Sequence, residues 1–137
     1  MLPRSKTVGR ILIVDDSRLT LQRYRDLFTE RGHEVETADH LFIAPLMSRF
    51  RPEVLLMDVN MRTERGSDTI RILRHTNLAD NTRMLLFSSM DEDELATLTE
   101  ECGADGFIRK SDDMQHVAAL VERWLASALQ RSTNSDA

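Results

Sequence analysis

Short runs of apolar residues alternate along the chain with longer stretches in which apolar side chains recur every three or four positions. A short continuous run is typical of a strand buried on both faces, and the wider spacing is typical of an amphipathic helix. The runs predict five strands, at residues 10–14, 33–37, 53–57, 83–87 and 105–109. The spaced stretches predict five helices, at residues 17–32, 39–50, 67–75, 89–102 and 112–129.

Several helix ends carry residues that start or stop helices. Ser17 is the predicted N-cap of the first helix, and Gly32 is its stop. Pro45 has no amide hydrogen, so the second helix should start late or kink. Ser89 and Glu92 have the spacing of a capping box, which predicts that the fourth helix begins at this point.

Strict alternation of strands and helices predicts an α/β fold. The expected architecture is a five-stranded parallel sheet with helices on both faces, a doubly wound (βα)5 arrangement of the flavodoxin-like type. One domain should span residues 10–129, with an N-terminal extension at residues 1–9 and a flexible polar tail at residues 130–137. In such folds ligands bind at the carboxyl ends of the strands, near the point where the strand order reverses.

Composition narrows the functional classes. Hydrophobic residues make up 41% of the 137 residues and charged residues 30%, which suits one ordinary globular domain. The formal net charge of -5 argues against direct nucleic-acid binding. We find neither an apolar stretch of membrane-spanning length nor a secretory signal, so no membrane insertion is expected. The single cysteine, Cys102, is predicted to be a buried apolar side chain, and the cytoplasm is the predicted location.

Acidic residues follow two of the predicted strands directly. Asp15 and Asp16 come after the first strand and Asp58 after the third. Because the carboxyl ends of parallel strands meet at one edge of a sheet, these carboxylates would repel one another unless a cation lies between them. Mg²⁺ is the best candidate because it prefers hard oxygen ligands and uses one or two protein carboxylates together with phosphate oxygens.

Two further chemical groups are expected at the same edge. Ser88 follows the fourth strand and Lys110 follows the fifth. A carboxylate can attack a phosphoryl group and form an aspartyl phosphate when cations offset its repulsion of the incoming charge. A metal ion, a hydroxyl and an ammonium group would together provide that stabilisation.

The chain resembles a response-regulator receiver domain over roughly residues 10–129. In that family an acidic pair ends the first strand, the phosphoacceptor aspartate ends the third, Ser or Thr ends the fourth and Lys ends the fifth. Each of these positions is matched here at the family's spacing, and Gly66 in the loop after Asp58 matches as well.

The resemblance implies a role for each matched residue. Asp58 would be the phosphoacceptor, with Ser88 and Lys110 holding phosphate oxygens. Phe107 would be the aromatic switch residue that turns inward on activation, together with Ser88. The implied ligands of Mg²⁺, for which Mn²⁺ can substitute, are Asp16 and Asp58 directly, Asp15 through water, and the backbone carbonyl of Asn60.

The resemblance also implies partners. A sensor histidine kinase or a phosphotransfer protein would supply the phosphoryl group, and phosphorylation would change the affinity for a downstream protein. The fourth helix, fifth strand and last helix would form the changing face, which could also support a homodimer. The protein would act as a stand-alone receiver, and it would be no enzyme beyond its own phosphorylation and dephosphorylation.

Four positions depart from the family pattern or tune it. Ser111 follows Lys110 where the family usually has a proline in a cis peptide bond, which leaves the geometry of this bond open. Arg62 replaces a frequent proline in the loop after Asp58. Met90 cannot orient an attacking water, so Asn60 is expected to set a phosphoryl lifetime that is not exceptionally short.

Two other classes of protein remain open. A phosphatase of similar topology would also use a nucleophilic aspartate, but it usually needs a second acid where this chain has Asn60. A phosphate-independent pseudo-receiver, or a receiver fragment of a longer regulator, would share the fold. The four histidines, His33, His40, His75 and His116, fall in different elements and are expected at the surface or at helix ends rather than in a metal site.

Overall fold

The computed structural model describes residues 8–62 and 64–135, with side chains up to residue 127. Strands and helices alternate without exception through this part of the chain. The elements are β1 (Arg10–Val14), α1 (Arg18–Glu30), β2 (Glu34–Ala38), α2 (Ala44–Phe50), β3 (Val54–Met57), α3 (Gly66–Arg74), β4 (Arg83–Ser88), α4 (Glu92–Cys102), β5 (Gly106–Arg109) and α5 (Met114–Ser135). All five predicted strands and all five predicted helices are present.

The five strands form one parallel sheet in the order β2-β1-β3-β4-β5. The strand order reverses between β1 and β3, because the chain moves outward to β2 on one side and to β4 and β5 on the other. This is the predicted doubly wound fold. The carboxyl ends of β1 and β3 therefore lie side by side at the switch point.

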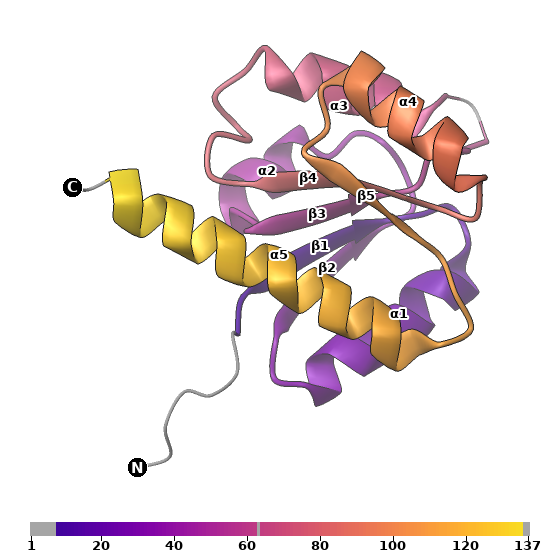
Figure 1. Ribbon diagram of the computed structural model, residues 1–137, viewed down its shortest axis with the longest axis horizontal. Helices are drawn as coiled ribbons and strands as arrows, with labels where there is room; N and C mark the ends of the chain where they lie inside the picture. The colour runs from indigo at the N-terminus through magenta and orange to yellow at the C-terminus, as the bar shows by residue number, and fades with distance from the viewer. Residues whose placement is uncertain (1–7, 63, 136–137) are drawn as a thin grey trace.

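Helices cover both faces of the sheet (Figure 1). On one face α1 and α5 pack against side chains such as Ile11, Ile13 and Phe87. On the other face α2, α3 and α4 pack against side chains such as Leu12, Leu55 and Leu86. Because each inner strand contributes to both cores, its sequence is a continuous apolar run rather than an alternating pattern.

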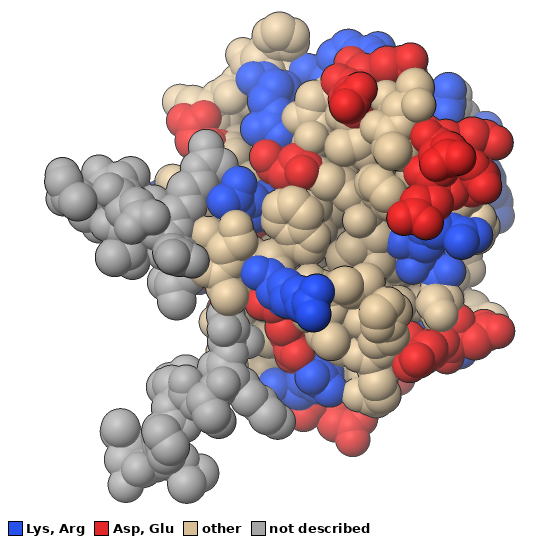
Figure 2. Space-filling model, in the orientation of Figure 1, with Lys and Arg blue, Asp and Glu red and all other residues tan. Residues whose placement is uncertain are grey.

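Charged side chains of both signs are distributed over the face that contains α4, β5 and α5, with uncharged surface between them (Figure 2). Among the described residues, none of the helices combines the length and the hydropathy that crossing a membrane would require. Cys102, the last residue of α4, is buried, as predicted, and packs against the core on that side of the sheet.

Local capping explains where the first two helices begin. The hydroxyl of Ser17 accepts a hydrogen bond from the backbone N–H of Thr20, which confirms Ser17 as the N-cap of α1. The second helix starts at Ala44 rather than residue 39, with Pro45 in its first turn, where a missing N–H costs no helical hydrogen bond. The predicted late start is therefore confirmed.

The capping box predicted at Ser89 is wrong. The N-cap of α4 is Asp91, whose carboxylate accepts a hydrogen bond from the N–H of Asp93. Ser89 lies in the preceding loop, where the hydroxyl of Ser88 accepts from the N–H of Met90. Because this local turn occupies the backbone before Asp91, the N-cap lies two residues later than the pattern suggested.

The last helix is longer than predicted. It continues to Ser135, so the stop at Leu129 is wrong and residues 130–135 are helical. The sequence after Asp112 contains no glycine or proline that would end a helix, and polarity alone is a poor stop signal. The rest of the predicted tail, residues 136–137, and most of the predicted extension, residues 1–7, lie outside the described residues.

The histidines are expected at the surface or at helix ends, and His33 lies just after the end of α1 but not at the surface. Its side chain is fully buried, and its Nε2 lies 2.9 Å from a carboxylate oxygen of Glu122 on α5. Its Nδ1 accepts a hydrogen bond from the N–H of Gly9. Arg31 binds both oxygens of the same carboxylate, at 2.9 and 2.6 Å. This Arg31–His33–Glu122 cluster ties α5 to the turn between α1 and β2.

Candidate functional site

Three aspartates gather at the switch point of the sheet. Asp15 and Asp16 follow β1 directly, and Asp58 follows β3 directly. The backbone N–H of Asp58 donates to the carbonyl of Val14, so the two strand ends stay paired where the acids begin. One carboxylate oxygen from each of the three aspartates lies within 4.8 Å of the others. The predicted acidic cluster is therefore present, with Asp15 and Asp58 buried and Asp16 partly exposed.

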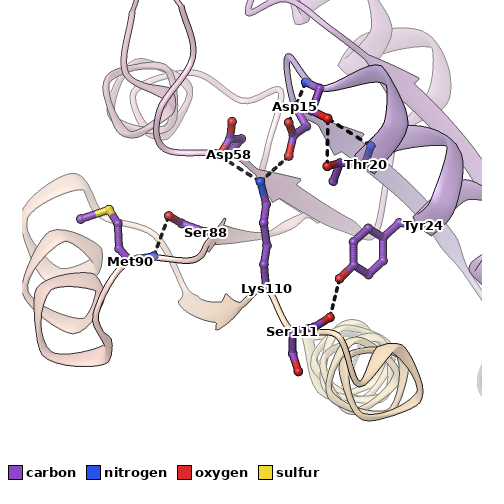
Figure 3. A network of polar contacts seen from close by, with 9 residues as sticks. Asp15, Thr20, Tyr24, Asp58, Ser88, Met90, Lys110 and Ser111 are labelled. Carbon is purple, nitrogen blue, oxygen red and sulfur yellow. Dashed lines mark hydrogen bonds and ion pairs between the residues drawn. The ribbon is translucent and has the colours of Figure 1, made fainter.

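Lys110 brings a positive charge into this cluster from the end of β5. Its Nζ lies 2.5 Å from Oδ2 of Asp15 and 3.3 Å from Oδ1 of Asp58 (Figure 3). The other oxygen of Asp15 accepts a hydrogen bond from the N–H of Ser17, at 2.9 Å. Lys110 thus spans the gap between the ends of β1 and β3, as its position after the fifth strand predicted.

Burial and mutual repulsion perturb the ionisation of this site. The pKa of Asp58 is raised, first because burial disfavours its charged form and then because Asp15 is nearby, although Lys110 acts in the opposite direction. Burial alone would lower the pKa of Lys110, but its hydrogen bond to Asp15 and the charges of Asp15 and Asp58 raise it overall. Lys110 is therefore charged at neutral pH, and it compensates only part of the negative charge around it.

The donor set fits a divalent cation with a preference for oxygen. Three carboxylates converge while one ammonium group offsets them, and no sulfur or imidazole ligand belongs to the cluster. A hard cation such as Mg²⁺ suits this combination. Asn60, whose carbonyl was predicted as a further ligand, lies exposed in the loop after β3 and pairs with Arg65 in an isolated bridge.

Gly66 shapes the loop that carries Asn60. A Cβ atom at this position would lie 1.9 Å from the backbone carbonyl oxygen of Asp58 and 2.6 Å from the side chain of Met57. The N–H of Gly66 donates to the carbonyl of Val59, which closes the loop back onto the end of β3. Only glycine allows this close approach, so the start of α3 is fixed directly beside Asp58.

Ser88 ends β4 beside the acidic cluster, but its hydroxyl forms no hydrogen bond with the carboxylates in this structure. The buried hydroxyl of Ser88 is directed at its own loop, where it accepts from the N–H of Met90 at 3.2 Å (Figure 3). Phe107 is partly buried and packs against the core on the α4 side of the sheet. Ser88 ends β4 at the carboxyl edge of the sheet, as the sequence predicts, but the sequence does not predict the direction of its side chain.

An aromatic support for Lys110 was not predicted. Tyr24 on α1 donates from its hydroxyl to the carbonyl of Ser111, at 3.3 Å, and its ring packs edge-on against Phe87. The Phe87 ring in turn lies 5.6 Å from the Lys110 Nζ. In the described residues no peptide bond is cis, so the bond between Lys110 and Ser111 is trans. A tyrosine at a core position of a helix is the sequence feature that could have suggested a polar partner for its hydroxyl.

Arg62 was identified in the sequence only as a departure from the family pattern. Its Nε lies 3.9 Å from a carboxylate oxygen of Asp16, although the arginine side chain is 85% exposed. A hollow beside the acidic cluster is lined by residues of the loops after β1, β2 and β3, among them Asp16, His40, Met61 and Arg62. The acidic cluster is therefore open to solvent on the side of Asp16.

The fold and the site together define a doubly wound α/β protein with an acidic, lysine-containing site at its switch point. The family model of the response regulator receiver domain matches residues 11–122. The chain therefore belongs to the response regulator receiver domain family. Domains of this family are phosphoacceptors of two-component systems rather than classical enzymes, and they generally bind Mg²⁺ at a cluster of aspartates.

Individual proteins show the same similarity. The chain is 32% identical over 110 residues to the nitrate/nitrite response regulator protein NarP of Escherichia coli, which covers 78% of this chain and 50% of NarP. It is 28% identical over 117 residues to the protein CcdB of Bacillus subtilis, covering 83% of this chain and 95% of CcdB. The chain thus spans about half of one of these relatives and nearly all of the other.

A solved structure supports the fold. The CheY-like response regulator receiver domain protein from Methanospirillum hungatei JF-1 superimposes with a TM-score of 0.79 at 19% identity, covering 90% of this chain and 98% of that one. At this level of identity the likeness concerns the fold alone. It confirms the predicted flavodoxin-like arrangement of five strands and five helices.

Proposed function

We propose that the protein accepts a phosphoryl group on Asp58 and that Mg²⁺ is required for the transfer. One observation carries this proposal: Asp58 lies buried at the switch point, beside two other carboxylates and within 3.3 Å of the ammonium of Lys110. A carboxylate in this position has both a nearby cation and a site for a second one. These are the conditions under which it can attack phosphorus despite the charge on the phosphoryl group.

The chemistry needs few groups. A carboxylate oxygen of Asp58 attacks phosphorus, the bond from phosphorus to the donor's leaving group breaks, and an acyl phosphate forms on Asp58. Lys110 moves its charge from the free carboxylates toward the phosphoryl oxygens, and the hydroxyl of Ser88 turns from Met90 to donate to one of them. When bound by Asp16, Asp58 and the carbonyl of Asn60, with Asp15 acting through water, Mg²⁺ supplies further positive charge for the same oxygens. Mn²⁺, which also accepts oxygen ligands, should substitute for it.

Phosphorylation should then be transmitted to the surface by Ser88 and Phe107. Movement of the Ser88 side chain opens space beside β4, and Phe107, which is only partly buried on the adjacent strand, turns inward to fill it. The surface formed by α4, β5 and α5 changes as a result, and it is the proposed contact face for a downstream protein or for a second copy of the chain. This face carries both acidic and basic side chains, which suits specific recognition of a partner with complementary charges (Figure 2).

The proposed phosphodonor is a sensor histidine kinase or a phosphotransfer protein, since receiver domains interact with these partners. We propose that the protein acts in the cytoplasm as a single receiver domain. The alternative is a receiver segment of a longer regulator, which the half-length match to NarP favours. The size of the protein detected by an antibody in its source cells would distinguish the two.

Intact-mass measurement after incubation with Mg²⁺ and acetyl phosphate tests the proposed chemistry. Wild-type protein should gain one phosphoryl group, and neither Asp58→Asn nor wild type in EDTA should gain it. Labelling of the variant would contradict the assignment of Asp58. A complete absence of labelling, together with a failure to bind Mg²⁺, would instead favour a phosphate-independent interaction module.

A further inference from the structure

Both polar backbone groups of Met90 are held in this structure. Its N–H donates to the hydroxyl of Ser88 at 3.2 Å, and its carbonyl accepts a hydrogen bond from Nε of Arg109 at 2.9 Å. Met90 is the residue directly before the N-cap of α4. These two contacts therefore fix the loop that joins Ser88 to α4.

Arg109 forms the rigid end of this arrangement. In the parallel pairing of β4 and β5 it lies opposite Ser88, and the next residue, Lys110, donates its N–H to the Ser88 carbonyl at 2.9 Å. The backbone of Arg109 is thus held by the sheet, while its exposed side chain extends across the sheet edge to the loop. Met90, in contrast, lies outside regular secondary structure.

We propose that Arg109 is a positioning residue that holds the loop after β4 in the conformation where the Ser88 hydroxyl faces Met90 instead of Asp58. This inference rests on the proposed function, because it concerns the hydroxyl that would bind the phosphoryl group. When Ser88 turns to Asp58, the N–H of Met90 loses its partner. The loop must then rearrange, and the Met90 carbonyl leaves the Arg109 side chain. The Arg109 contact therefore stabilises the unphosphorylated conformation and opposes the switch.

Removing this contact should shift the equilibrium toward the switched conformation. Loss of one charge-assisted hydrogen bond at an exposed site corresponds to a change of about threefold to tenfold in an equilibrium constant. Arg109→Ala should bind beryllofluoride in the presence of Mg²⁺ about threefold to tenfold more tightly than wild type, because this phosphoryl mimic selects the switched conformation. Its affinity for Mg²⁺ alone should not change, since Arg109 has no contact with the acidic cluster.

Two measurements test the proposal. The first is titration of wild type, Arg109→Ala and the control Arg49→Ala, which removes an exposed arginine on α2, with Mg²⁺ alone and with Mg²⁺ and beryllofluoride. The second is the amide chemical shift of Met90 in the ligand-free proteins. In Arg109→Ala it should move toward its value in the wild-type beryllofluoride complex.

Each outcome decides between clear alternatives. Tighter beryllofluoride binding by Arg109→Ala, with unchanged Mg²⁺ affinity and a shifted Met90 amide, supports the proposal. Equal beryllofluoride affinities for variant and wild type overturn it, and so does a loss of Mg²⁺ affinity, which would mean that Arg109 supports the metal site. If wild type itself binds no beryllofluoride, the proposed function fails, whatever Arg109 does.

Discussion

Lys110 contacts Asp15 more closely than it contacts Asp58: its Nζ lies 2.5 Å from the first carboxylate and 3.3 Å from the second. The partly buried ammonium is therefore held mainly by an aspartate that is not the proposed phosphoacceptor. Asp15 keeps Lys110 within reach of Asp58, but the lysine, shared between two carboxylates, does not neutralise Asp58 fully. The raised pKa of Asp58, which follows from its burial and from the charge of Asp15, agrees with this incomplete compensation.

Lys110→Ala should bind Mg²⁺ more tightly and accept phosphate more slowly. The lysine repels a cation placed among the same carboxylates, so its removal should raise Mg²⁺ affinity by about threefold to tenfold. The phosphoryl group then lacks one of its two cations, and labelling of Asp58 by acetyl phosphate should fall by at least about tenfold. Calorimetric titration and intact-mass time courses would measure the two effects, with Arg49→Ala as the control for the loss of an exposed positive charge. Weaker Mg²⁺ binding by Lys110→Ala would contradict the prediction that the lysine repels the metal ion.

Asp58→Asn should be more stable than wild type at neutral pH. A folded-state pKa raised above the unfolded value means that ionisation of Asp58 destabilises the fold, and this cost appears as the pH rises from the unfolded value of 3.8 through the raised one. The neutral amide avoids the cost, and a gain on the order of 1 kcal/mol, or about 4 °C in Tm, is expected. Thermal unfolding of wild type and Asp58→Asn, measured in EDTA over a range of pH, would check this gain in stability. The difference should vanish at about pH 3, where Asp58 is protonated in both states.

The site could be predicted because two apolar runs end in acids. Residues 11–14 and 54–57 are buried on both faces, and parallel pairing then places Asp15 and Asp58 at one edge of the sheet without further information. The order of chemical groups along the chain is thus converted into proximity by the topology. The same reasoning predicted Lys110, whose side chain is long enough to reach across from β5.

Contacts made between side chains of distant elements could not be predicted in this way. The start of α4 is an example: Ser89 and Asp91 are both good capping residues, and the loop before Asp91 is held by the contact of Arg109 with the Met90 carbonyl, nineteen residues away in the sequence. The burial of His33 depends on a carboxylate almost ninety residues away in the sequence. Neither arrangement leaves a periodic pattern in the local sequence.

Tyr24→Phe should slow phosphorylation while leaving the protein folded. The substitution removes the hydroxyl that donates to the Ser111 carbonyl but keeps the ring that packs against Phe87. The stability loss should stay within about 1 kcal/mol, because this is a single neutral hydrogen bond. Since Ser111 follows Lys110 directly, we expect a looser lysine and a labelling rate about threefold lower at saturating Mg²⁺. Tyr24→Leu, which also removes the aromatic contacts, should be slower still, and an unchanged rate in both variants would rule out a role for Tyr24 in positioning Lys110.

The Arg31–His33–Glu122 cluster gives the last helix a pH-dependent attachment. The pKa of Glu122 is lowered, first by its hydrogen bonds from Arg31 and then by His33, with burial acting in the opposite direction. A lowered folded-state pKa stabilises the fold at any pH above the unfolded value of 4.5. This stability is lost as the pH falls through the lowered pKa, because protonation removes the charge that Arg31 binds.

Glu122→Gln should therefore destabilise the protein at pH 7 by about 1 to 2 kcal/mol, the cost expected when a partly buried ion pair loses one charge. The glutamine keeps the size of the side chain, so packing between α5 and the sheet should be retained. Urea unfolding at pH 7 and at about pH 3 would measure the effect, with the exposed Glu100→Gln on α4 as the control. The gap between wild type and Glu122→Gln should narrow at the lower pH, where Glu122 itself becomes protonated. A gap that is equal at both pH values would mean that shape or neutral hydrogen bonding, rather than the charge of Glu122, attaches α5 to the turn between α1 and β2.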